Sequence, residues 1–260
     1  IFEEPNIEEY KSTFASALPF KHICIDNFID LSFVNSLHNH FPALGEMRKK
    51  YNGINEKKAE DAEFGQLHLD FTILKEQLQS EKIKRWIERI TGINDLQTSN
   101  DQRGAGLHQG GQNSFLDIHI DFNVHPLLNL HRRLNLIIFL NPGWQDAWGG
   151  HLEFWNKDVS SCINKYLPIH NRCVIFETNE ISYHGYSKIN IPAGESRKSF
   201  YTYYYTSLSS GVKYHDTVFK TRPEETIFKA FTTKSKDLLK NTVKKTFKNL
   251  GIDTYFKKLE

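Results

Sequence analysis

The sequence predicts a mainly β protein with flanking helices, whose strands form a sandwich, a jelly roll or a barrel. Three observations lead to this class. Between residues 104 and 208 the chain runs as short β-like segments separated by Gly, Pro and Asn. Helical patterns precede this region and return after residue 222. A hydrophobic content of 39% and an aromatic content of 13% suffice for a sizeable core and exclude a disordered chain.

The first hundred residues are predicted to form three helices and one strand. Apolar residues at helical spacing indicate helices at 6–17, 30–41 and 72–91. Asp30 is the expected N-cap of the second helix, because its short polar side chain can accept hydrogen bonds from free backbone N–H groups. The alternating segment FKHICIDNF (20–28) is the expected strand.

Residues 44–66 are predicted to form a long loop. They are polar, contain glycine and show neither the helical nor the strand period. A loop of this length in a compact domain often acts as a lid over a site. We therefore expect this loop, together with the loop at 123–132, to form the wall of a substrate pocket.

The β region is predicted to contain seven strands, each bounded by turn residues. Their regular spacing is typical of sandwiches, jelly rolls and barrels rather than of alternating βαβ units. The expected strands are 104–108, 114–121, 133–140, 151–155, 172–177, 181–185 and 197–207.

The chain is expected to be a single domain over 1–222, with helical support over 1–100 and the β core over 101–210. A basic helical extension is expected over 223–260. Residues 220–260 carry eleven Lys/Arg against five Asp/Glu, a net charge of +6. The whole chain has a net charge of +2, so the rest carries −4. The lysine face of the extension is interpreted as a solvated surface rather than a membrane contact.

Composition restricts the class of partner and the cell compartment. An acidic body disfavours a nucleic-acid partner, because phosphate contacts need clustered Lys and Arg. No apolar run approaches the roughly 20 residues that a membrane-spanning helix needs. The three cysteines, Cys24, Cys162 and Cys173, show no Cys-x-x-Cys spacing. This pattern favours a reduced, cytoplasmic setting.

The segment LDIHIDFNVHP (116–126) raises the question of a metal site. Alternate residues of a strand point to the same side, so His119 and Asp121 are expected to face together. A neutral imidazole and a carboxylate one pleat apart suit a first-row metal ion, and a third ligand would complete a facial set. The pair alone is a weak signal, since two exposed strand residues would give the same spacing.

The third ligand is expected from a distant strand. The candidates are the downstream histidines: His125, His131, His151, His170, His184 and His215. Among them His184 is favoured, because it follows the apolar strand CVIFE (173–177) and precedes RKSFYTYYYT (197–206). In that last run Arg197 and Ser199 share a face and can hold one carboxylate together. The alternative for Arg197 is a surface ion pair, for example with Glu195.

The order His119-x-Asp121, His184, Arg197-x-Ser199 resembles the Fe(II)- and 2-oxoglutarate-dependent dioxygenases, in particular the branch with prolyl-4-hydroxylase-like catalytic domains. The motifs cover about 104–207. Three further segments also look like that branch: LPFKHICIDNFID (18–30), RRLNLIIFLNPGW (132–144) and WGGHLEFW (148–155). The resemblance implies a double-stranded β-helix, which is a jelly roll of cupin-like form.

The resemblance also implies a set of roles. His119, Asp121 and His184 would bind Fe(II), and Arg197 would bind the distal carboxylate of 2-oxoglutarate with help from Ser199. The cosubstrate and O2 would take the three remaining metal positions. The implied reaction is hydroxylation of an unactivated C–H bond of a small molecule or a peptidyl residue, with release of succinate and CO2. Relatives that halogenate lack the carboxylate ligand, so the presence of Asp121 favours hydroxylation.

Further contacts to 2-oxoglutarate are expected from Asn135, Tyr203 and Gln109. Asn135 shares a strand face with Arg133 and Ile137, where it could touch the cosubstrate or satisfy neighbouring backbone. Relatives often place a tyrosine before the His-x-Asp strand, and this sequence has Gln109 there instead. Tyr203, like Tyr201, could take over that contact or pack in the core.

Two other functions remain open from the sequence. One is a non-catalytic jelly-roll module that binds a metal or another ligand, such as a carbohydrate or a protein. The other is a nucleic-acid demethylase-type oxygenase, which the acidic body disfavours.

Overall fold

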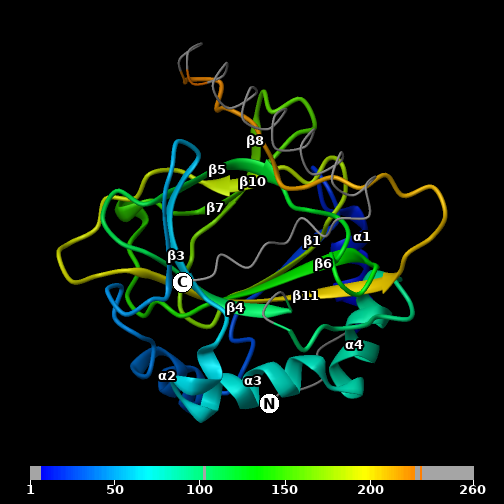
Figure 1. The fold of residues 1–260 in the computed structure, drawn as a ribbon, viewed down its shortest axis with the longest axis horizontal. Coiled ribbons are helices and arrows are strands. Elements are labelled where there is room, and N and C mark those ends of the chain that lie inside the picture. The colour runs from blue at the N-terminus through cyan, green and yellow to red at the C-terminus, as the bar shows by residue number, and fades with distance from the viewer. Residues whose placement is uncertain (1–6, 102–103, 226–228, 230–260) are drawn as a thin grey trace.

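The computed structural model describes residues 7–101, 104–225 and 229. Its strands form two facing antiparallel layers around a hollow (Figure 1). The lower layer has the order β1 (His22–Ile25), β9 (Cys173–Glu177), β6 (Leu130–Phe139), β11 (Arg197–Ser207) and β4 (Ala105–Gly110). The upper layer has the order β5 (Phe115–Ile120), β10 (His184–Tyr186), β7 (Leu152–Trp155) and β8 (Cys162–Tyr166). This is the jelly roll that the sequence predicts.

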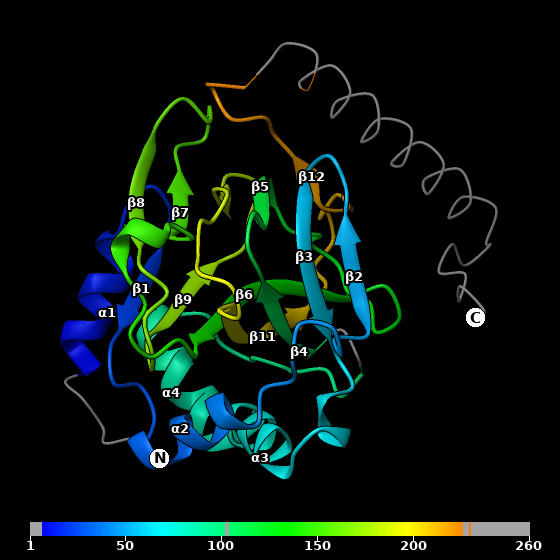
Figure 2. The same cartoon turned by 90° about the vertical axis from the view of Figure 1, so that its left-hand side faces the viewer.

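The prediction of a long loop over 44–66 is wrong. This segment forms the hairpin of β2 (Lys49–Asn52) and β3 (Glu56–Asp61), followed by the short helix η1 (Phe64–Gln66). β3 pairs with β4 through Glu60 and His108, and with β5 through Glu56 and Leu116, so it joins the two layers (Figure 2). The hydrophobic pattern missed β3 because its inward side chains are polar.

The prediction of one helix over 72–91 is also wrong. The structure has α3 (Leu69–Gln79) and α4 (Glu81–Thr91), separated by Ser80 in an extended conformation. The Ser80 hydroxyl accepts a hydrogen bond from the backbone N–H of Ile83 and so caps α4. The sequence did not reveal this break, because the apolar residues keep their helical spacing on both sides of Ser80.

The other helices are confirmed, as α1 (Ile7–Ser16) and α2 (Leu31–Asn39). Asp30 caps α2 as expected, by accepting from the N–H of Phe33 at 3.0 Å. α2, α3 and α4 lie beneath the lower layer (Figures 1 and 2). The main core fills the space between these helices and the lower layer. It includes Val34, Leu37, Leu74 and Ile87 from the helices and Leu134, Leu136 and Ile138 from β6.

Strand alternation then decides what faces the hollow. Leu134, Leu136 and Ile138 point to the helices, so Asn135, Ile137 and Phe139 point inward. Inside, one part of the hollow is filled by a second apolar cluster, hereafter the inner cluster: Phe20, Phe139, Leu152, Phe154, Val174 and Phe176. The remaining space is lined by polar side chains.

All seven strands expected between 104 and 208 are present, although β10 begins only at His184. The short strands β8 and β12 (Val218–Phe219) were not expected. Beyond Glu225, the expected basic extension lies outside the described residues, apart from Lys229. None of the helices that the structure describes is both long enough and apolar enough to cross a membrane.

Candidate active site

Seven of the eight predicted site residues line one cavity between the two layers: His119, Asp121, Asn135, His184, Arg197, Ser199 and Tyr203. The eighth, Gln109, does not. It lies on the opposite face of β4, where its Nε2 donates to Ser196 Oγ at 2.8 Å. Its neighbour His108 faces inward and lines the cavity instead. The expectation that Gln109 contacts the cosubstrate therefore disagrees with the register of β4.

The predicted triad comes together at the ends of two neighbouring strands. His119 on β5 and His184 on β10 are direct cross-strand partners, and their ring centroids are 4.3 Å apart. Asp121 follows the end of β5, with Oδ1 3.6 Å from His119 Nε2 and Oδ2 3.6 Å from His184 Nε2. Candidate ligand atoms of the three residues all lie within 4.8 Å of one another. Such a set of two imidazoles and one carboxylate suits non-haem iron.

Both histidines are held in the tautomer that a metal requires. His119 Nδ1 lies 2.8 Å from the carbonyl oxygen of Asp117, and His184 Nδ1 lies 2.9 Å from that of Ser182. A carbonyl only accepts, so each Nδ1 carries the proton and donates it. The lone pair of each Nε2 then points towards Asp121. Burial, followed by the neighbouring His119, lowers the pKa of His184 to about 3, which keeps it neutral.

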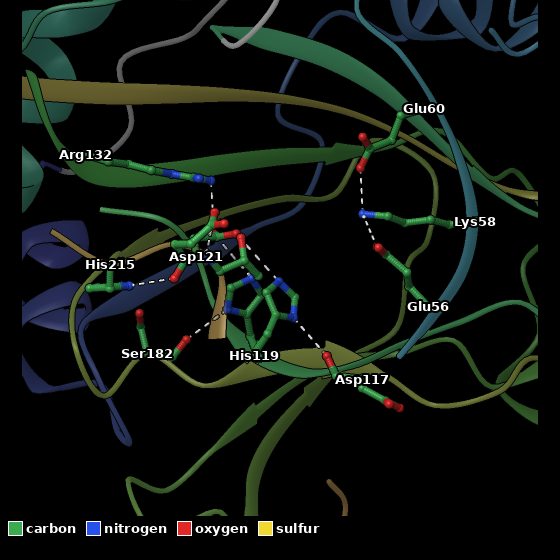
Figure 3. A network of polar contacts seen from close by, with 12 residues as sticks. Glu56, Lys58, Glu60, Asp117, His119, Asp121, Arg132, Ser182 and His215 are labelled. Carbon is green, nitrogen blue, oxygen red and sulfur yellow. Dashed lines mark hydrogen bonds and ion pairs between the residues drawn. The ribbon is translucent and has the colours of Figure 1, made fainter. Parts of the chain in front are cut away.

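Asp121 is paired with Arg132, a residue that the sequence analysis did not single out. Arg132 Nη2 lies 3.0 Å from Asp121 Oδ2, and the arginine is fully buried (Figure 3). Burial acts to raise the pKa of Asp121, but the Arg132 guanidinium outweighs it and holds that pKa well below the usual range. Asp121 is therefore a carboxylate at neutral pH. No spacing rule links residues 121 and 132, so only the fold shows this pair.

A second histidine group is less suited to a metal. Within the part of the chain that the structure describes, His40, His68 and Asp70 also bring possible ligand atoms together. The two rings lie 3.5 Å apart and within 6° of parallel. Ring-nitrogen lone pairs lie in the ring plane, so in this stack they run side by side rather than converge. Four of the other five candidates for a third ligand pair elsewhere: His125 with Asp101, His151 with Asp146, His170 with Asn35 and His215 with Glu180. The fifth, His131, is not part of the group of possible ligand atoms.

Arg197 lies at another part of the same cavity and is only 3% exposed. Its guanidinium lies over the rings of Tyr186 and Phe139, and its Nε donates to the carbonyl oxygen of Gly150 at 2.7 Å. It pairs with no carboxylate among the residues that the structure describes, and its burial disagrees with the alternative of a surface pair with Glu195. Burial lowers the pKa of Arg197 to about 10, so the group is a buried cation at neutral pH.

Further polar atoms in this part of the cavity also lack partners within the described chain. His108 Nε2 and Asn135 Oδ1 are buried and accept or donate no hydrogen bond. Native proteins pair nearly all such atoms, so these two indicate a polar ligand. Burial, together with the charges of Lys58 and Arg197, lowers the pKa of His108 well below its usual value. His108 is thus a neutral side chain that the sequence analysis did not single out.

The aromatic wall of the cavity comes from β11. The ring of Tyr203 stacks on the guanidinium of Arg132 at 3.4 Å, and the rings of Tyr201 and Tyr203 are 5.1 Å apart. Both tyrosines line the cavity, so neither is a plain core residue. β3 contributes Lys58 and Glu60 to the same cavity. Lys58 Nζ lies 2.6 Å from Glu60 Oε1 and 3.3 Å from Glu56 Oε2 (Figure 3).

Comparisons with known proteins agree with this geometry. Residues 105–205 match the sequence profile of the 2OG-Fe(II) oxygenase superfamily. Prolyl 3-hydroxylase OGFOD1 of Mus musculus is 26% identical over 176 residues, which is 66% of this chain and 30% of that protein. The chain therefore spans less than a third of the length of this curated relative.

Solved structures share the fold at low identity. A Pseudomonas putida prolyl-4-hydroxylase superposes with a TM-score of 0.55 at 16% identity, covering 76% of this chain and 99% of that one. A prolyl 4-hydroxylase from Phytophthora capsici superposes with a TM-score of 0.53 at 16% identity, covering 79% and 68%. At this identity the structures support the jelly-roll fold.

Proposed function

We propose that this chain, whose residues 105–205 match the 2OG-Fe(II) oxygenase superfamily, is an oxygenase of that family and hydroxylates a prolyl residue of a peptide or protein. The family uses Fe(II), 2-oxoglutarate and O2, and the triad, Arg197 and the unpaired polar atoms of the cavity fit these groups. The prolyl substrate rests on the name of the mouse relative. A free amino acid or another small molecule is the alternative substrate.

His119, Asp121 and His184 would hold the iron, through two imidazole nitrogens and one carboxylate. When bound there, Fe(II) supplies the redox chemistry by which O2 converts 2-oxoglutarate to succinate and CO2 and hydroxylates the substrate C–H bond. The protein contributes two histidines that turn Nε2 towards the ion. The Nδ1–H groups of both histidines remain on backbone carbonyls, so neither ring is free to rotate.

The observation that carries the proposal is the buried, uncompensated charge of Arg197 in the same cavity as the triad. A buried cation is costly unless an anion pairs with it. The distal carboxylate of 2-oxoglutarate is such an anion and would accept two parallel N–H bonds from a guanidinium. Ser199 and His108 face each other across the β11–β4 pair and could add donors from beside it.

The substrate would enter against the aromatic wall of Tyr201 and Tyr203, in the cavity that Glu60 also lines. The C–H groups of the pyrrolidine ring of proline pack well against an aromatic face. Glu60 could accept a hydrogen bond from a backbone N–H of the bound peptide.

The test measures two properties of the purified chain. Anaerobic Fe(II) plus 2-oxoglutarate should give a weak visible charge-transfer band, and air should then release succinate. A proline-containing peptide library should gain one oxygen by mass spectrometry, and a library with alanine in place of proline should not.

His119→Ala should abolish the band and the succinate. His151→Ala, which alters a histidine paired with Asp146 outside the cavity, should leave both unchanged. A wild-type chain that shows neither band nor succinate would overturn the enzyme assignment. Succinate release with an unmodified proline library would leave the enzyme and remove the prolyl substrate.

A further inference from the structure

Asp121 is the one residue of the triad that no strand ladder fixes. His119 and His184 are paired within β5 and β10, whereas β5 ends at Ile120. The carboxylate must therefore be held by contacts of its own side chain. A metal ligand displaced by even one ångström loses its geometry, so those contacts matter for the site.

The contact comes from Arg132 on β6. The backbone N–H of Arg132 donates to the carbonyl oxygen of Asn123 at 2.8 Å, which ties the start of β6 to the segment just after Asp121. Arg132 Nη2 then reaches Asp121 Oδ2 at 3.0 Å. The same strand and the same loop thus place both members of the pair.

Aromatic rings hold the guanidinium in place. Its carbon lies 3.4 Å from the ring centroid of Tyr203 and 4.7 Å from that of Phe122. Arg132 has no exposed surface, and its Nε and Nη1 are buried without a hydrogen-bond partner among the residues that the structure describes. A planar cation between rings has little freedom to rotate away from the carboxylate.

A purely stabilising role does not explain this arrangement. Burying a guanidinium costs free energy, and a buried ion pair is often no better for stability than apolar residues of similar volume. Leaving two donors unpaired adds to that cost. The pair is therefore better explained by what it does to Asp121.

We propose that Arg132 is a positioning residue that occupies Asp121 Oδ2 and leaves Oδ1 as the oxygen presented to the metal. Oδ1 and Oδ2 each lie 3.6 Å from one ligand nitrogen, of His119 and His184 respectively, so distance to the histidines does not distinguish them. The hydrogen bond from Arg132 does, because it is made to Oδ2 alone. A carboxylate that binds through one oxygen leaves three positions of an octahedral ion open, whereas one that binds through both leaves two. The inference rests on the proposed function only for the identity of the metal.

The experiment measures Co(II) binding to the full chain by calorimetry, with Co(II) as a stand-in for Fe(II). Arg132→Met should weaken Co(II) binding about 10- to 100-fold, the usual effect of losing a group that orients a metal ligand. Arg132→Lys keeps the charge but loses the planar stack, and should bind Co(II) with intermediate affinity. Arg133→Met is the matched control, because Arg133 is the next residue and pairs with Glu177 instead.

A second measurement separates positioning from folding. Circular dichroism establishes that each variant is folded, and the anaerobic Fe(II)/2-oxoglutarate band should shift or weaken in the Arg132 variants and not in Arg133→Met. If Arg132→Met does not fold, Arg132→Lys decides. A folded Arg132 variant with the Co(II) affinity and the band of wild type would overturn the inference. Failure of the proposed function is a different result: wild type would bind Co(II) but release no succinate.

Discussion

Arg132 and Arg197 are two buried guanidinium groups at one site: Arg197 lines the cavity, and Arg132 contacts Asp121, which lines it. Arg132 has a carboxylate partner in Asp121, whereas Arg197 pairs with none that the structure describes. Arg197 could be predicted because it shares a strand face with Ser199 in a motif of fixed order. Arg132 could not, since its partner lies 11 positions away across a loop and the pair follows only from tertiary structure.

Arg197→Met should separate stability from cosubstrate binding. Losing a charge-assisted pair of hydrogen bonds should raise the KM for 2-oxoglutarate by about 10- to 100-fold. The metal- and cosubstrate-free protein should be as stable as wild type, or up to about 2 kcal/mol more stable, because a buried unpaired charge has been removed. Initial rates of succinate release and chemical unfolding measure the two effects.

Arg133→Met, which breaks a half-buried pair with Glu177, should leave the KM unchanged. If Arg197→Met instead destabilised the free protein by several kcal/mol at unchanged KM, the charge would have an internal partner and no role in anion binding.

At the scale of elements, β3 is the strand that could not be predicted from the sequence. Its segment EKKAED is polar at nearly every position, so neither alternation nor burial could be inferred. The strand exists because β4 and β5 each offer it a free edge, and its inward Lys58 and Glu60 meet a polar cavity rather than a core. By contrast, β6 and β9 were predicted to within three residues at each end, because the segments LNLIIF and CVIF are largely apolar and bounded by polar residues.

The Lys58–Glu60 pair should behave as a coupled unit. Tyr51 also donates to Glu60, at 3.0 Å, and the Lys58 charge helps to hold the pKa of Glu60 low against the opposing effect of burial. Lys58→Met and Glu60→Gln should each destabilise the folded chain by about 2–3 kcal/mol, somewhat below the usual loss for a fully buried pair. The double variant should lose less stability than the sum of the losses in the two single variants.

Urea unfolding of the wild type and three variants gives the coupling energy. Lys57→Met, on the opposite face of β3, is the matched control and should change stability little. Strictly additive losses would mean that the two side chains do not stabilise each other.

At the scale of the whole molecule, the jelly roll places side chains from distant segments on one inner surface. His119 and His184 are 65 positions apart in the sequence and adjacent across a strand pair. Motif order was enough to predict that they meet. Which inward residues fill the hollow and which line the cavity could not be predicted. The inner cluster and the polar cavity use the same strands, and a residue's position along its strand decides to which of them it belongs.

The inner cluster should therefore affect the metal centre, and the main core should not. Phe176 packs against the His184 ring at 4.8 Å, and Phe154 packs against Phe176 at 5.2 Å and is the cross-strand partner of His184. Phe154→Ala should lower the free energy of unfolding by about 3–5 kcal/mol. It should also weaken Co(II) binding, because the cavity that it leaves removes packing from behind the His184 ring.

Ile87→Ala provides the comparison, since Ile87 is fully buried on α4 beneath the other face of the sheet. Ile87→Ala should lower the free energy of unfolding by a similar amount, about 2–5 kcal/mol. It should leave the Co(II) affinity of the folded protein at the wild-type value. Thermal unfolding and calorimetry on both variants measure the two quantities. Equal losses of affinity in the two variants would mean that general loosening, rather than the packing behind His184, controls the site.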